Sequence, residues 1–348
     1  MGGNGWRPAR TAAVALVVLV AVVLSGCTPL QPHRPVDDWP GSGPLRIEQI
    51  RLRDPFVVAD RASGWYYLVG TGSGFPMYRS RDLSSWYGPK QVFTPPPGFW
   101  GTNRSWAPEV HRYRGRWYLF GSFADTPQDQ LTASSTVGTA VLVANRPDGP
   151  YRPLTNGPVT PQDRFALDGT LLVDHASVPW LVYSHEWIDP RLDRIGQMEA
   201  VQLSADLARP VGEPVTLFTA TSAPWANQDP IAHLFGGIVD GPWLHRTCAG
   251  DLLMLWSSFS VATYTTGVAR STTGRVTGPW AQLPTPFFSD DGGHASLFEG
   301  FDGVLRAVFH APNRSTEHPV ITPVSDAGGT VSPTTLADAT RHACTPHR

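Results

Sequence analysis

The chain has little cysteine, no excess of one charge sign and almost no helical patterning. Only three of its 348 residues are cysteines, and histidines at metal-ligand spacing are absent, which argues against a zinc site. The formal net charge is −2, so we expect no nucleic-acid partner. After residue 45 no long stretch places apolar residues at i, i+3, i+4 and i+7, which argues against a helical fold.

The N-terminus is patterned for export. Arg7 and Arg10 precede a short apolar run over residues 11–24, which is too short for a comfortable membrane span. Leu24-Ser25-Gly26-Cys27 follows and resembles the lipobox of bacterial lipoproteins, in which the cysteine becomes the lipidated first residue. We therefore expect Cys27 to be lipidated, with an ordinary signal peptide and an incidental cysteine as the alternative.

These patterns predict how the chain is divided at its start. Residues 1–27 are expected to be a lipoprotein signal peptide, and residues 28–46, rich in Pro, Gly and Asp, a flexible tether. The protein would then be anchored by lipid to the outer face of the cell membrane. The two remaining cysteines, Cys248 and Cys344, would either form one disulfide in an oxidising compartment or stay as thiols.

Short runs of β-branched and aromatic residues recur in one order along the chain. A polar turn precedes an apolar strand, an aromatic strand ending in Gly or Ser follows, and a last strand often carries Gly-Pro. The copies open near residues 54, 108, 168, 240 and 294. Steps of this length accommodate a four-stranded antiparallel sheet, and radial repetition of such sheets gives a propeller rather than a β-sandwich. The repeat predicts an all-β, five-bladed β-propeller over residues 47–328, followed by a tail over 329–348.

Ionisable residues open all five repeats. They are Asp54, Glu109, Asp168, Asp240 and His294. The first strand of each propeller blade lines the axis, so we expect these side chains to converge at one mouth of the channel. An aspartate before Pro or Gly is by itself usually a turn former, but several carboxylates gathered together are costly unless they are used. The pattern therefore predicts a functional site and disfavours a purely structural scaffold.

The same residues carry a resemblance to glycoside hydrolase family 43, which spans residues 48–325. Arg53-Asp54-Pro55 resembles the motif of that family's general base, and Trp106-Ala107-Pro108-Glu109 its second-blade Trp-Ala-Pro motif. Leu167-Asp168-Gly169-Thr170 matches the third-blade aspartate, which orients the acid and tunes its pKa. Gly293-His294 resembles the fifth-blade histidine near the axis.

The resemblance implies a five-bladed propeller that hydrolyses glycosides with inversion of configuration. It makes Asp54 the general base and Asp168 the residue that tunes the acid. The expected substrates are oligosaccharides or polysaccharides bearing arabinofuranosyl, xylosyl or related sugars, cleaved outside the cytoplasm by a monomer. It requires no cofactor, and it allows a structural Ca²⁺ near the propeller axis beside His294.

The fourth-blade motif departs from the family. Val239-Asp240-Gly241-Pro242 stands where the family usually has Glu as general acid. Aspartate is one methylene shorter, which sets its carboxyl back by about 1.5 Å, and such a misplacement costs ~100-fold in rate unless something compensates. Three interpretations stay open: Asp240 is still the general acid, Glu186 supplies the proton instead, or the protein binds carbohydrate without hydrolysing it.

Other residues are candidates for contact with the sugar. Aromatic rings can stack on a sugar face, although most tryptophans in such a fold fill the gaps between blades. Polar side chains near the mouth can bind its hydroxyls. The candidates are Phe56, Trp106, Glu109, Trp187, Trp225, His294 and His310.

Overall fold

The computed structural model describes residues 1–3, 5, 39–226, 237–261 and 263–341. Cys27, the lipobox and most of the expected tether lie outside the described residues, as does Cys344. Cys248 is disulfide-bonded. Among the described residues, no helix has the length and apolar character needed to cross a membrane.

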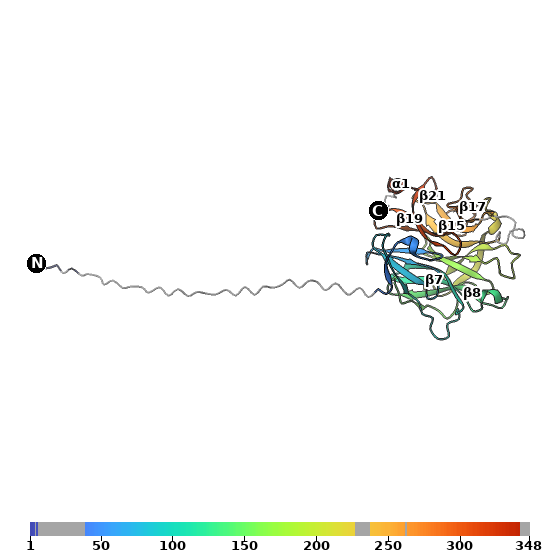
Figure 1. Cartoon of the computed structure of the whole chain (residues 1–348), viewed down its shortest axis with the longest axis horizontal. Helices are drawn as coiled ribbons and strands as arrows, with labels where there is room; N and C mark the ends of the chain where they lie inside the picture. The colour runs from blue at the N-terminus through green and yellow to red at the C-terminus, as the bar shows by residue number, and fades with distance from the viewer. Residues whose placement is uncertain (4, 6–38, 227–236, 262, 342–348) are drawn as a thin grey trace. The chain divides into compact units, whose positions relative to one another are not determined.

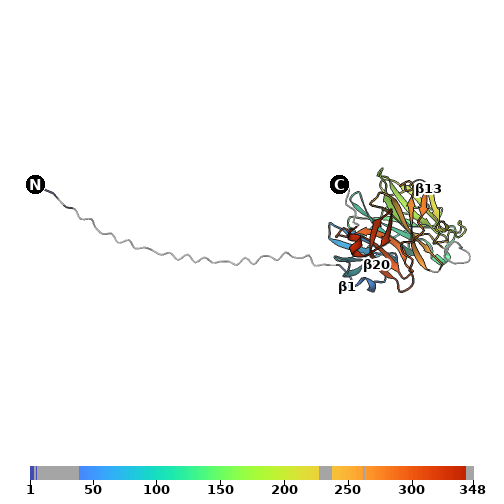
Figure 2. The same cartoon turned by 90° about the horizontal axis from the view of Figure 1, so that it is seen from above.

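The part of the chain from Trp39 onward is built from antiparallel sheets arranged as five blades (Figures 1 and 2). In blade 1 the strands run in the order β1 (Ser42–Leu45), β5 (Trp86–Gln91), β4 (Pro76–Ser80), β3 (Trp65–Val69) and β2 (Phe56–Asp60). Blade 2 contains β6 (Arg104–Tyr113), β7 (Arg116–Ala124), β8 (Val137–Ala144) and β9 (Arg152–Pro153). Blade 3 contains β10 (Ala166–Val173), β11 (Pro179–His185), β12 (Gln197–Leu203) and β13 (Pro210–Thr219).

The last two blades follow the same plan. Blade 4 contains β14 (Asp240–Arg246), β15 (Leu252–Phe259), β16 (Tyr264–Ser271) and β17 (Trp280–Gln282). Blade 5 contains β18 (Gly293–Glu299), β19 (Leu305–Ala311), β20 (His318–Ala327) and β21 (Thr330–Pro333). The helical elements described are the short 3₁₀ turns η1 (Ile47–Gln49), η2 (Gln128–Gln130) and η3 (Ala220–Ser222) and the helix α1 (Leu336–Arg341).

The blades close into a ring through their first strands. Strand β2 contacts β6, β6 contacts β10, β10 contacts β14, β14 contacts β18, and β18 contacts β2 again. Blades 2 and 3 also share one parallel pairing, between Gly138 and Ala166. Apolar side chains from neighbouring sheets fill the space between blades, as where Phe75, Phe93 and Phe123 meet edge to face or stacked. The predicted five-bladed propeller is confirmed.

Two details of the sequence prediction need comment. The recurring Gly-Pro turn adopts a cis peptide bond in three blades, at Gly88-Pro89, Gly149-Pro150 and Gly278-Pro279. The predicted limits of 47–328 are too narrow, because strand β1 pairs with β5 before residue 47 and β21 pairs with β20 after residue 328. Both are edge strands, whose single pairing partner leaves a weak sequence signal.

Candidate active site

Each first strand opens on a residue with a left-handed backbone. Among the described residues these five equivalent positions are Asp54, Ala107, Asp168, Gly241 and His294, with φ between 40° and 58°. In blades 2 to 5 the pairing register shifts at the same place, which marks a β-bulge. This conformation costs a residue with a Cβ roughly 1–2 kcal/mol. Four of these five positions carry a residue with a Cβ, and strain repeated at equivalent positions is typical of a functional site.

This alignment corrects the expected positions in blades 2 and 4, which are Ala107 and Gly241 rather than Glu109 and Asp240. Glu109 is buried two residues further along β6 and pairs with His111 at 2.8 Å, so it does not line the mouth. Gly241 has no room for a side chain, because a Cβ there would lie 2.7 Å from Cγ of His294.

Two aromatic candidates are also elsewhere. Phe56 packs edge-on against Trp243 in the core, with ring centroids 5.4 Å apart. Trp225 packs against Trp256, with centroids 4.9 Å apart. Each fills a gap within or between blades, so neither prediction of sugar stacking holds. Trp106 lies one residue before Ala107 and does line the mouth.

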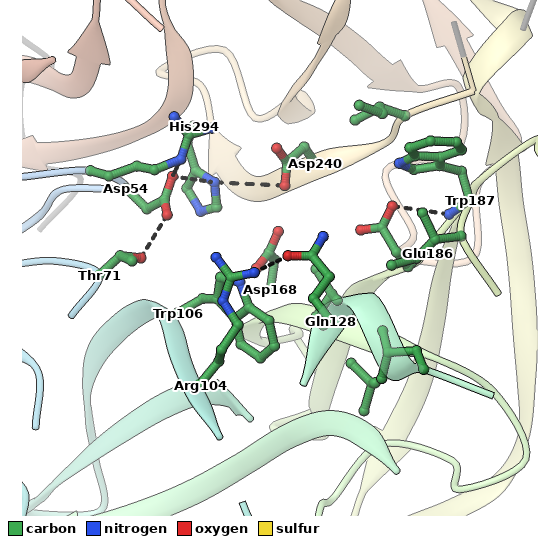
Figure 3. A pocket seen from close by; sticks show the side chains of 16 residues that line it. Asp54, Thr71, Arg104, Trp106, Gln128, Asp168, Glu186, Trp187, Asp240 and His294 are labelled. Atoms are coloured by element: carbon green, nitrogen blue, oxygen red, sulfur yellow. Dashed lines mark hydrogen bonds and ion pairs between the residues drawn. The ribbon is translucent and has the colours of Figure 1, made fainter. Parts of the chain in front are cut away.

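The mouth holds a pocket of about 380 Å³ that gathers four carboxyl groups (Figure 3). They come from three blades: Asp54 from blade 1, Asp168 and Glu186 from blade 3, and Asp240 from blade 4. The remaining lining residues are Arg53, Thr71, Arg104, Trp106, Gln128, Leu131, Val137, Leu167, Trp187, Ile188, Ile238 and His294.

Asp54 is held as a carboxylate. Its Oδ2 accepts a hydrogen bond of 2.6 Å from the Thr71 hydroxyl, and its Oδ1 lies 3.4 Å from Nδ1 of His294. Arg53 Nε lies 3.7 Å from the same Oδ1. Burial alone would raise the pKa of Asp54, but the neighbouring His294 and Arg53 and the Thr71 hydrogen bond outweigh it and hold the pKa below its usual value. The group is therefore an available proton acceptor at neutral pH.

His310 supports Asp54 from behind and is itself buried, so it does not line the mouth as expected. The Asp54 amide donates to His310 Nδ1 at 3.3 Å, which leaves the ring proton on Nε2, 3.2 Å from Oδ1 of Asn313. Burial lowers the pKa of His310 to about 4, so the ring is neutral at physiological pH. Asn313 Oδ1 also accepts from Arg53, so Asn313 connects the two neighbours of Asp54, Arg53 and His310.

Asp168 and Asp240 form a hydrogen-bonded pair opposite Asp54. Burial, the charge of Asp240 and that hydrogen bond raise the pKa of Asp168 well above its usual value. The raised pKa makes Asp168 easier to protonate than Asp54. The Tyr264 hydroxyl donates to Oδ2 of Asp240, and the other oxygen lies 3.8 Å from Nδ1 of His294.

Glu186 completes the set of carboxyls and follows strand β11 at the mouth. Burial and the charge of Asp240 raise the pKa of Glu186 to about 8, although the Trp187 amide donates to Oε1 at 3.1 Å. Glu186 is therefore a carboxylic acid at neutral pH. Figure 3 shows it across the pocket from Asp54, with Asp240 between them.

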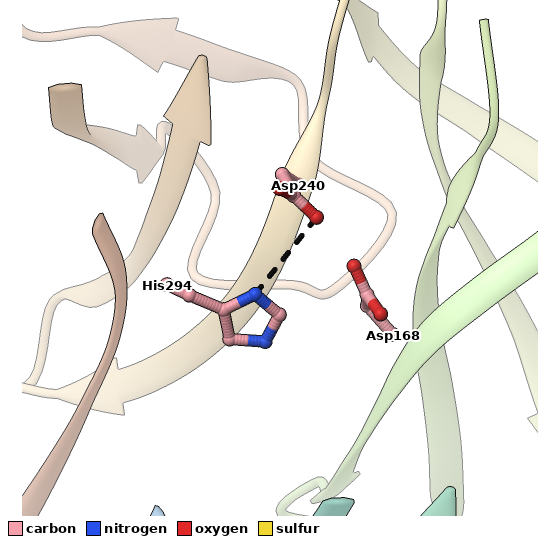
Figure 4. Close-up of side chains that lie close together, drawn as sticks. All are labelled: Asp168, Asp240 and His294. Atoms are coloured by element: carbon pink, nitrogen blue, oxygen red, sulfur yellow. Dashed lines mark ion pairs between the residues drawn. The ribbon is translucent and has the colours of Figure 1, made fainter. Parts of the chain in front are cut away.

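Three side chains near the propeller axis could offer ligand atoms to a metal ion. Asp168, Asp240 and His294 each offer one such atom, all within 4.8 Å of one another (Figure 4). Ca²⁺ takes about 6–8 oxygen ligands, whereas this set has only two carboxyls and an imidazole. These three residues do not fit calcium as direct ligands, and no catalytic step is assigned to a metal.

The mouth also carries an aromatic and cationic wall. Arg104 lies over the Trp106 ring, 5.1 Å from its centroid, and contacts the side chain of Gln128. Trp187 lies beyond Glu186, with Arg194 5.8 Å from its ring centroid. Flat rings beside carboxyl groups are suited to a sugar. Thr71 and Tyr264 were missed from the sequence, because nothing in an isolated Thr or Tyr shows that it faces a carboxylate from another strand.

A five-bladed propeller whose mouth gathers opposed carboxyl groups has the arrangement of a glycoside hydrolase. The chain belongs to the glycosyl hydrolases family 43, whose family model matches residues 47–331.

Named relatives agree with this assignment. The chain is 26% identical over 273 residues to the extracellular exo-alpha-(1->5)-L-arabinofuranosidase ArbA of Cellvibrio japonicus, covering 73% of this chain and 72% of the relative. It is 25% identical over 154 residues to extracellular endo-alpha-(1->5)-L-arabinanase 1 of Bacillus subtilis, covering 41% of this chain and 46% of that one. Its structure is similar to that of the endo-arabinase from Bacteroides thetaiotaomicron, with 38% identity, a TM-score of 0.74, and coverage of 83% of this chain and 99% of that one.

Proposed function

We propose that the protein hydrolyses α-L-arabinofuranosyl linkages of arabinan, outside the cytoplasm, by a single displacement with inversion. The observation that carries the proposal is the single pocket that sets Asp54 across from the carboxyl groups of Asp168, Asp240 and Glu186. The names of the similar proteins, which include both an exo-acting arabinofuranosidase and endo-arabinanases, support arabinan as the substrate. The reaction as written requires no cofactor.

The chemistry follows from the positions of the carboxyls. A water beside Asp54 gives its proton to that carboxylate while its oxygen bonds to the anomeric carbon. The glycosidic C–O bond breaks on the opposite face, and the leaving oxygen takes a proton from a carboxylic acid across the pocket. Asp240 and Glu186 are the two carboxyls on that side (Figure 3). Asp168 keeps Asp240 in place through their hydrogen bond.

The carboxyl spacing is compatible with inversion. His294 Nδ1 lies 3.4 Å from Oδ1 of Asp54 and 3.8 Å from Oδ1 of Asp240, so those oxygens are at most about 7 Å apart. Inverting enzymes place their carboxyls about 6.5–9.5 Å apart, to leave room for the water. The separation between Asp54 and Asp240 therefore reaches at most the lower part of this range. A carboxyl group further from Asp54 would fit the range better.

The test uses the purified full-length protein in mild detergent with linear arabinan, arabino-oligosaccharides, xylan and galactan. We expect turnover of the arabinosides and, by proton NMR, a first-formed product with the anomeric configuration opposite to that of the substrate. A product of retained configuration would refute the mechanism. No turnover of any of these glycans, with binding still detected by calorimetry, would favour a carbohydrate-binding propeller instead.

We also propose that Cys27 anchors the protein by lipid to the outer face of the membrane. The support is the sequence pattern up to Cys27 and the extracellular location in the names of two relatives. In a bacterial host that processes lipoproteins, the wild-type chain should fractionate with membranes and incorporate labelled palmitate. Cys27→Ser should incorporate none, and equal labelling of both chains would contradict the anchor.

A further inference from the structure

The arrangement around Asp240 leaves it poorly placed to give up a proton. The Tyr264 hydroxyl donates to its Oδ2, and Asp168 shares a hydrogen bond with it, so both neighbours occupy its oxygens. Its side chain is 22% exposed and lies against His294 on its other side. A general acid must carry the proton itself and present it to the leaving oxygen. Asp240 is instead suited to accept hydrogen bonds at the centre of the pocket.

Glu186 has the opposite environment. The only protein donor to its carboxyl among the described residues is the Trp187 amide, which binds Oε1. The second oxygen has no partner within the described part of the chain, and the side chain lines the pocket. A carboxyl with one anchored oxygen and one directed into a substrate pocket can donate a proton outward.

The segment that carries Glu186 is anchored firmly. The Glu186 amide donates to the Phe165 carbonyl at 2.8 Å, and its own carbonyl accepts from the Asp189 amide at 2.9 Å. The buried ring of His185, one residue earlier, lies between two carboxylates, 3.0 Å from Asp189 Oδ2 and 3.3 Å from Glu199 Oε1. Asp189 also accepts from the Phe165 amide at 2.8 Å. Such fixed surroundings give Glu186 a defined position relative to the mouth.

We propose that Glu186, from the second strand of blade 3, is the general acid of this enzyme, in place of the residue at position 240. This rests on the proposed function and specifies which group protonates the leaving oxygen. Asp54 takes the proton of the attacking water, Glu186 gives its proton to the departing glycosidic oxygen, and Asp240 lies between them as a hydrogen-bond acceptor. Burial and the neighbouring Asp240 raise the pKa of Glu186 to about 8.

The test compares Glu186→Gln and Asp240→Asn on two substrates that differ only in their leaving group. 4-Nitrophenyl α-L-arabinofuranoside needs little acid assistance, whereas arabinotriose needs it fully. For Glu186→Gln we expect kcat/KM to fall ~10²–10⁴-fold on arabinotriose and only a few-fold on the nitrophenyl substrate. The decline of wild-type activity as the pH rises through about 8 should disappear in this variant. Asp240→Asn should keep the alkaline decline but move it to lower pH, because the charge that helps to raise the pKa of Glu186 is removed.

Three controls make the result decisive. Glu213→Gln changes an exposed glutamate on β13 of the same blade and should leave both rates unchanged. Glu186→Asp, which keeps the acid but shortens it, should retain part of the arabinotriose activity and the alkaline decline, even if the Gln variant fails to fold. Undiminished arabinotriose turnover by Glu186→Gln, or disappearance of the alkaline decline in Asp240→Asn, would overturn the inference. Absence of wild-type turnover on any arabinoside would instead overturn the proposed function itself.

Discussion

The Thr71 hydroxyl lies 2.6 Å from Oδ2 of Asp54 and donates a hydrogen bond to it. The Thr71 hydroxyl oxygen accepts in turn from the Ala107 amide of the next blade, at 2.8 Å. The Thr71 side chain therefore lowers the pKa of Asp54 in blade 1 and holds the opening residue of blade 2. Its two roles can be separated by substitution.

Thr71→Val removes the hydroxyl and keeps the shape of the side chain. Because the hydrogen bond lowers the pKa of Asp54, its loss should move the acidic limb of the kcat/KM profile to higher pH. Leaving the Ala107 amide unpaired should also cost about 1–3 kcal/mol of stability, seen as a lower Tm. Thr71→Ser keeps the hydroxyl and should resemble the wild type in both measurements. Superimposable acidic limbs for Val and wild type would contradict the role given to Thr71.

Asp54→Asn should slow the hydrolysis of every substrate, whatever its leaving group. Activation of the water is needed for every substrate, so kcat/KM should fall ~10²–10⁴-fold on both 4-nitrophenyl arabinofuranoside and arabinotriose. Asp302→Asn, on the exposed turn between β18 and β19, is the matched control and should retain full activity. Substantial nitrophenyl turnover by Asp54→Asn would remove Asp54 from its assigned role.

Stability should depend on pH through Glu186. Its pKa is raised from 4.5 to about 8 in the folded state, so between these values unfolding releases a proton and the free energy of unfolding falls as pH rises. Below 4.5 the group is protonated in both states and contributes no pH dependence. Glu186→Gln lacks this pH dependence, so its free energy of unfolding should gain on that of the wild type by up to about 1.4 kcal/mol per pH unit between about pH 4.5 and 8. The gain would be measured as a rise in its Tm relative to the wild type. A constant difference in Tm across this range would show that Glu186 titrates normally.

Removing divalent cations should leave the enzyme active. Asp168, Asp240 and Tyr264 are already engaged with one another, so the pocket offers a calcium ion few available oxygens. We expect kcat/KM and Tm to be unchanged after dialysis against EDTA. If millimolar Ca²⁺ raised Tm in the wild type but not in His294→Gln, the calcium expected from the family resemblance would be present there after all.

The blades can be predicted from the sequence because the turn residues repeat. The opening positions of blades 1, 3 and 5 can also be predicted, since each carries an ionisable residue: Asp54, Asp168 and His294. In blades 2 and 4 the equivalent positions carry Ala107 and Gly241, which have no ionisable group, so the sequence directs the prediction to the nearest charged residue. For Asp240 the error was one residue and left it in the pocket, whereas for Glu109 it was two and led to the core.

The protonation states were likewise outside the reach of the sequence. They depend on contacts between strands and between blades. Tyr264 donates to Asp240 within blade 4, and Asp240 is hydrogen-bonded to Asp168 of blade 3. Glu186 was found as an alternative acid because the second strand of a blade returns to the mouth. Its raised pKa follows from burial beside Asp240, which no local pattern encodes.

The opening amides of four blades are held by side chains that lie on, or just after, the second strand of the preceding blade. Thr71 accepts from Ala107, Ser122 from Asp168 at 2.7 Å, and Ser257 from His294 at 2.9 Å. The fourth of these hydrogen bonds joins the last blade to the first, since the His310 ring of blade 5 accepts from the Asp54 amide of blade 1.

The proposed general base is thus positioned by the blade that is synthesised last. A chain interrupted before blade 5 would carry Asp54 without His310 behind it or His294 beside it, and so without two of the contacts that orient it and set its pKa. The complete surroundings of Asp54 therefore form only when the first and last blades of the propeller meet.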